Sequence, residues 1–124
     1  MLQNIILVGL GSMAGGISRY LLSAGIKQLI PSLFPWGTFM VNMSGCFIIG
    51  LLSGWLSGVP LFPAHQRLLF IVGFCGSFTT FSTFTMDNLN LLTTKAYALL
   101  FLNIGASIGL GLLFTAIGFW LMRR

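Results

Sequence analysis

One segment of the chain, GFCGSFTTFSTFTMDN (residues 73–88), gathers the side chains that could do chemistry. It holds two glycines, six hydroxyl side chains, one Asp and one Asn, with a phenylalanine at nearly every helical turn. Hydroxyls are hydrogen-bond donors, and the edge of an aromatic ring carries partial positive charge. Side by side, these groups form an environment that tolerates an anion without a fixed cation.

The rest of the chain is strongly apolar. Of its 124 residues, 56% are hydrophobic and only 6% are charged, and the mean hydropathy is +1.00. A soluble domain carries about 25% charged residues, so this composition predicts an integral membrane protein. The net charge of +5 comes from basic residues that are scattered and form no patch, so we expect no nucleic-acid partner.

Four apolar segments are long enough to cross a bilayer, which takes about 20 residues as a helix. They cover approximately residues 4–26, 37–56, 66–92 and 96–121, with a break at GVPLFP (58–63). The prediction is therefore an all-α protein whose residues 1–124 form a single transmembrane domain. The N-terminus lacks the basic stretch of a signal peptide. Gly105 and Gly109, four residues apart, predict close helix packing.

The basic residues are nearly balanced between the two ends of the spans. Four spans place Arg67, Arg123 and Arg124 on one side, and Lys27 and Lys95 on the other, joined by Arg19 if it lies near the end of its span. A bias of Lys and Arg to the cytoplasmic side normally fixes orientation. A chain without this bias can insert both ways, which predicts an antiparallel homodimer with dual topology and a two-fold axis in the membrane plane.

The third span is predicted to be broken near 76–80, because glycine, serine and threonine make a poor helix centre. Irregular backbone inside a membrane survives only within protein or beside water. A break frees carbonyls that bind cations. Two interpretations stay open: facing carbonyls of two copies hold a cation, or the Ser and Thr hydroxyls simply cap the break. Phe74, Phe78, Phe81 and Phe84 are expected to share one helical face.

Other polar residues lie inside the predicted spans. Asn42 either makes a helix–helix hydrogen bond or donates its amide to an anion. Asn103 and Ser107 are four residues apart and could extend a polar track. Arg19 either snorkels to the interface or serves as a charge in a pore vestibule.

Three segments make the chain similar to the Fluc-type fluoride channels of the CrcB family. They are GSMAGGISRY (11–20), GTFMVNMSGCFIIG (37–50) and, above all, GFCGSFTTFSTF (73–84). The resemblance covers essentially the whole chain. It implies an antiparallel dual-topology homodimer with two pores, which exports fluoride passively across the bacterial inner membrane.

The resemblance also implies roles for individual residues. The backbone carbonyls of Gly76 and Thr79 would hold a central, structural Na⁺ at the dimer interface. Arg19 would lie at the pore vestibule, and Asp87 has no assigned role. The residues that would line the fluoride pore are Asn42, Phe81, Ser82, Thr83, Phe84, Asn103 and Ser107.

Two alternatives to a fluoride channel remain. A small dual-topology multidrug antiporter needs a membrane-embedded carboxylate, and the only acid here is Asp87, in the third span. A non-transporting membrane assembly subunit would use Asn42 and the phenylalanines for packing alone. An enzyme is not expected, because one histidine and one acid supply no nucleophile–base pair or metal set.

Overall fold

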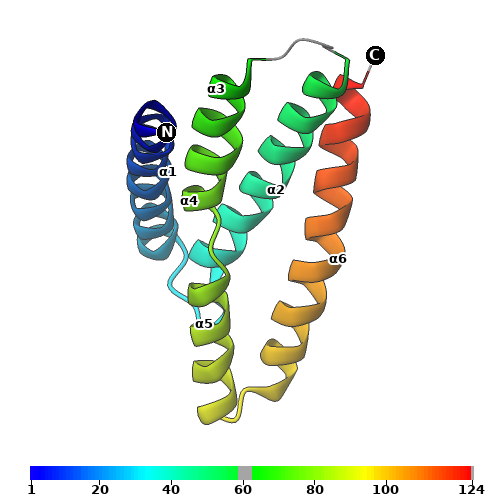
Figure 1. The fold of residues 1–124 in the computed structure, drawn as a ribbon. Coiled ribbons are helices and arrows are strands. Elements are labelled where there is room, and N and C mark those ends of the chain that lie inside the picture. The colour runs from blue at the N-terminus through cyan, green and yellow to red at the C-terminus, as the bar shows by residue number, and fades with distance from the viewer. Residues whose placement is uncertain (59–62, 124) are drawn as a thin grey trace.

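The structure, a computed structural model, describes residues 1–58 and 63–123 (Figure 1). Within those residues all regular structure is helical and no strand occurs. The elements in chain order are α1 (Leu2–Leu29), α2 (Trp36–Ser57), α3 (Ala64–Arg67), the π-helix η1 (Leu68–Cys75), α4 (Gly76–Phe78), α5 (Phe81–Thr93) and α6 (Tyr97–Met122). Most of the predicted break at 58–63, and Arg124, lie outside the described residues.

Four helical segments are long and apolar enough to cross a membrane. They are Leu2–Leu29, Trp36–Ser57, Ala64–Thr93 and Tyr97–Met122, and the third of them joins α3, η1, α4 and α5. Each predicted span coincides with one of these segments to within a few residues. The chain is therefore a multi-pass membrane protein.

The four segments run up and down. The N-terminus, α3 and the C-terminus lie at one end, the upper end in Figure 1, and the turn between α5 and α6 lies at the other end. α2 makes its most extensive contact with α6, whereas α1 packs mainly on η1 and to a lesser, equal extent on α2 and α4. α5 contacts α6 and, to a small extent, α2. The lower half of the third segment is thus held mainly by α6.

Glycines set the closest of these contacts. Gly11 and Gly15 of α1 are buried, and a Cβ added at Gly15 would overlap the carbonyl of Phe74. Gly50 and Gly54 of α2 approach the α6 backbone in the same way. Small residues at such points let helix backbones approach each other, which strengthens the van der Waals packing between helices in lipid.

The prediction that Gly105 and Gly109 pack closely is wrong within this chain. A Cβ at either position would meet nothing within 4 Å, and both glycines are exposed. The physical reason is that α6 packs on α2 through another face, on which Gly111 and Gly118 are buried.

Gly15→Ala is expected to destabilise the protein by about 1–3 kcal/mol, because the new methyl group pushes α1 away from the third segment. The matched control is Gly16→Ala, where a Cβ meets nothing within 4 Å. Unfolding of the purified protein in detergent, followed against denaturant concentration, measures both changes. Equal losses in the two variants would contradict the packing described here.

Candidate functional site

The third membrane segment is interrupted at Thr79 and Thr80, inside the predicted range 76–80. Both residues are extended, with φ/ψ of −79°/156° at Thr79 and −148°/121° at Thr80. Gly76, which was expected to weaken the helix, is still helical within α4. The break falls on the threonines because a β-branched residue favours extended backbone and threonine is a good N-cap.

Thr80 is the N-cap of α5. Its Oγ1 accepts a hydrogen bond from the backbone N–H of Thr83 at 3.2 Å. The same Oγ1 lies 3.1 Å from the hydroxyl of Thr83 and 3.3 Å from that of Ser82. The hydroxyls of Ser82 and Thr83 therefore contribute to the cap at the start of α5. Capping of the break by Ser and Thr hydroxyls is one of the two interpretations that the sequence allows.

Asn42 of α2 binds the break with both ends of its side-chain amide. Its Oδ1 accepts from the backbone N–H of Thr80 at 2.8 Å, and its Nδ2 donates to the carbonyl of Thr80 at 3.0 Å. The first bond satisfies the Thr80 N–H, which has no helical acceptor, and the second adds a donor to the Thr80 carbonyl; both matter because Thr80 is buried. An Nδ2 group has two hydrogens, so one N–H remains for another acceptor.

A groove of about 390 Å³ lies beside this break. It is lined by Asn42, Met43, Cys46, Ile49, Thr79, Thr80, Phe81, Phe84, Ser107 and Ile108. Four of the predicted pore residues, Asn42, Phe81, Phe84 and Ser107, thus meet at one place from α2, α5 and α6. Ser82, Thr83 and Asn103 do not line this groove.

The four phenylalanines do not share one helical face, so that prediction is wrong. Phe74 and Phe78 stack with their centroids 5.6 Å apart, and Phe81 and Phe84 form a second pair at 5.9 Å. Phe78 is only 5% exposed, whereas Phe81 is 77% exposed. The extended backbone at Thr79 and Thr80 turns the chain between the two pairs, so helical spacing does not continue across the break.

Asn103 lies next to the groove in a short polar chain between α5 and α6. It is 1% exposed, and its Nδ2 donates to Oδ1 of Asn88 at 2.8 Å. Its own Oδ1 accepts from the hydroxyl of Ser107 at 3.4 Å. Sequence reasoning gave Asn88 no role, although it follows Phe81 and Phe84 at spacings of seven and four residues and so lies on their face of α5.

Asn103→Ala is expected to destabilise the protein by about 1–3 kcal/mol, since it removes a buried amide and leaves the half-buried Asn88 without its donor. The measurement is denaturant unfolding of Asn103→Ala, Asn88→Ala and the double variant. Because the two side chains bond each other, the losses should be non-additive. Strictly additive losses would show that the bond contributes nothing.

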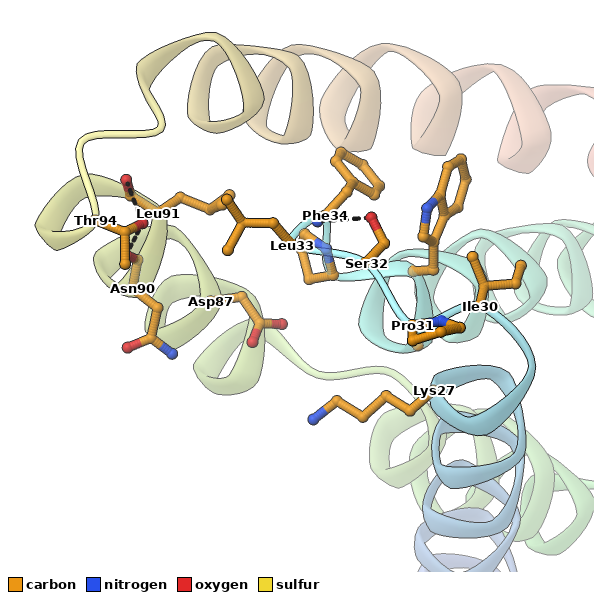
Figure 2. A pocket seen from close by; sticks show the side chains of 13 residues that line it. Lys27, Ile30, Pro31, Ser32, Leu33, Phe34, Asp87, Asn90, Leu91 and Thr94 are labelled. Atoms are coloured by element: carbon orange, nitrogen blue, oxygen red, sulfur yellow. Dashed lines mark hydrogen bonds between the residues drawn. The ribbon is translucent and has the colours of Figure 1, made fainter.

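A second cavity, of about 370 Å³, lies between the end of α1, the connection to α2, and α5 (Figure 2). Lys27 of α1 and Asp87 of α5 extend toward it from different sides. Oδ2 of Asp87 is buried and has no hydrogen-bond partner among the described residues. Arg19 is half-buried on α1 and lines neither of these two cavities.

Comparison with known proteins places these features in a family. Residues 6–119 match the family model described as CrcB-like protein, Camphor Resistance (CrcB). The chain belongs to the CrcB-like family. The resemblance of its three sequence segments to this family is thereby confirmed.

Curated relatives cover almost the full length of this CrcB-like chain. A protein of Phocaeicola vulgatus is 38% identical over 120 residues, 97% of this chain and 98% of the relative. One from Hydrogenobaculum sp. is 41% identical over 116 residues, 94% of each chain. One from Flavobacterium psychrophilum is 35% identical over 117 residues, again 94% of each chain. Each of the three is named fluoride-specific ion channel FluC.

Proposed function

We propose that this protein is a fluoride-selective channel that lets fluoride leave the bacterial cytoplasm passively across the inner membrane. The observation that carries the proposal is the full-length similarity to relatives named fluoride-specific ion channels, at 35–41% identity. The groove beside the helix break supports it, because the groove combines the groups that an anion needs.

Fluoride is small and strongly hydrated, so a pore must replace its water by hydrogen-bond donors or positive ring edges. The free N–H of Asn42 and the rings of Phe81 and Phe84 are such groups. Ser107 adds a hydroxyl, whose 3.4 Å bond to Asn103 is long enough to yield to a better acceptor. Weak binding at several such sites permits exit as well as entry.

The working unit in this proposal is an antiparallel homodimer with dual topology and two pores. Two observations support it. The basic residues are balanced between the two ends of the spans, and Phe81, which lines the groove, is 77% exposed on a single chain. A second copy in the opposite orientation would cover that face and close the groove into a pathway.

A central Na⁺ between the two copies completes the proposal. Gly76 and Thr79 would supply its ligands as backbone carbonyls. The donor set suits a hard cation, because carbonyl oxygens replace a hydration shell. The Gly76 carbonyl fits this role, since the Thr80 N–H that would normally bond it donates to Asn42 instead.

The proposal is tested by efflux from liposomes that contain the purified protein. Vesicles loaded with KF receive a potassium ionophore, and a fluoride electrode follows release; vesicles loaded with KCl are the control. We expect rapid fluoride release and no chloride release. Absence of fluoride flux from folded protein would exclude the channel and favour the antiporter or the assembly subunit.

A further inference from the structure

We infer that Asn42 is the positioning residue of the central cation site: one hydrogen bond to its side-chain oxygen both frees the Gly76 carbonyl and aims the Thr79 carbonyl. The inference rests on the proposed function, from which it takes the cation and its two ligands. It adds a residue from a different helix, 38 positions away in the sequence, to the machinery of that site.

The Gly76 carbonyl lacks its usual helical donor. In an α-helix the N–H of residue 80 donates to the carbonyl of residue 76. The preceding bond of this kind is present, from the N–H of Thr79 to the carbonyl of Cys75 at 3.1 Å. The Thr80 N–H is taken by Oδ1 of Asn42 at 2.8 Å, so Gly76 is the residue at which the helical pattern stops.

The Thr79 carbonyl belongs to the same peptide unit as the Thr80 N–H. A trans peptide is planar, and its N–H and C=O point in opposite directions. No cis peptide bond occurs in the described chain. Holding the N–H toward Asn42 therefore directs the Thr79 carbonyl away from α2.

The peptide unit between Thr79 and Thr80 has little freedom to rotate. Nδ2 of Asn42 holds the next peptide unit through the Thr80 carbonyl at 3.0 Å. On the other side, the hydroxyl of Thr79 donates to the carbonyl of Cys75 at 2.9 Å. The Thr79 carbonyl of the proposed site is thus oriented by bonds that do not involve a cation.

The α2 helix is shaped for this contact. Gly45 lies one turn after Asn42, and a Cβ there would overlap the methyl group of Thr79 and lie 3.2 Å from the ring of Phe78. The missing side chain lets the break approach α2 until the amide of Asn42 reaches the backbone. Val41 and Met43, on either side of Asn42, are 0% and 6% exposed, so the α2 backbone is fixed there.

The test separates orientation of the cation site from binding of fluoride. The purified dimer is melted in NaCl solutions in which N-methylglucamine chloride replaces Na⁺ at constant ionic strength. A ligand that binds only the folded state raises the melting temperature with its concentration. Fluoride efflux from liposomes is measured on the same preparations.

Three variants are compared with the parent chain. Asn42→Ala removes both bonds, and the half-saturating Na⁺ concentration should rise about tenfold or more, where tenfold corresponds to about 1.4 kcal/mol. Asn42→Asp keeps an oxygen that accepts from Thr80 but places negative charge in the groove. It should lose fluoride flux, yet its half-saturating Na⁺ concentration should stay within about threefold of that of the parent chain. Phe81→Ile changes a side chain that lines the same groove but forms no hydrogen bond with Thr79 or Thr80, so it should behave likewise.

An unchanged Na⁺ dependence in Asn42→Ala would overturn the inference, as would its loss in Phe81→Ile. If Asn42→Ala does not fold, Asn42→Leu takes its place, because leucine has nearly the volume of asparagine but accepts no hydrogen bond from Thr80: a weakened Na⁺ dependence supports the assignment, and an unchanged one overturns it. A parent chain that conducts fluoride without any Na⁺ dependence would refute this inference alone. A parent chain that conducts no fluoride would refute the proposed function.

Discussion

Phe81→Ile is expected to lower fluoride efflux by about a hundredfold, which corresponds to about 2.7 kcal/mol of lost stabilisation for the ion in the groove. The ring of Phe81 lines the groove, and its centroid lies 5.9 Å from that of Phe84. An aromatic ring offers a positive edge to an anion, and an aliphatic side chain offers none. The loss should appear as a lower initial rate at the fluoride electrode.

Phe101→Ile is the matched control for this variant. Phe101 lies on α6 and is 71% exposed, close to the 77% of Phe81, but it does not line the groove. We expect this variant to conduct as the parent chain does. Phe81→Ile protein that is dimeric and conducts at the parent rate would show that the ring takes no part in the pathway.

Fixing the orientation of the chain is expected to abolish flux almost completely. One variant, Lys27→Gln with Lys95→Asn, loses both lysines of one end and keeps the arginines of the other end, with Arg19 unchanged within α1. A second variant, with Arg67, Arg123 and Arg124 changed to Gln, keeps the opposite set. Asn is chosen at position 95 because Lys95 has a φ of 59°, a conformation that Asn tolerates.

The positive-inside rule predicts that each variant inserts in one orientation, and in opposite senses. Neither variant alone can form an antiparallel pair, so neither should conduct fluoride or protect cells that are grown in fluoride. Co-expression of the two should restore flux, and cysteine labelling from each side of the membrane confirms the orientations. Full activity of either variant alone, in a single orientation, would refute the dual-topology dimer.

The membrane-spanning segments could be predicted from the sequence because lipid imposes a simple length and polarity rule. A helix must satisfy its own backbone and needs about 20 apolar residues, and both properties can be read along the chain. A break near 76–80 could also be predicted, because glycine, serine and threonine make a poor helix centre. Its position at Thr79 and Thr80 could not, because the bonds that stabilise it come from Asn42, far away in the sequence.

The candidate site could be predicted only in part. Asn42, Phe81, Phe84 and Ser107 meet beside one groove, although three helices contribute them. The prediction that four phenylalanines share one helical face is wrong, because a helical period does not continue through extended backbone. The partnership of Asn103 with Asn88 also went unseen, since which polar side chain faces another depends on how α5 and α6 rotate against each other.

The central claim, passive conduction of fluoride with rejection of chloride, is tested most directly by a reversal potential. The purified protein is placed in a planar bilayer with a tenfold gradient of NaF and equal NaCl on both sides. A fluoride-selective channel predicts a current that reverses near the fluoride equilibrium potential, about 59 mV in magnitude, and does not shift when a chloride gradient is added. A reversal that follows the chloride gradient would contradict the account, and so would the absence of current from protein that is folded and dimeric.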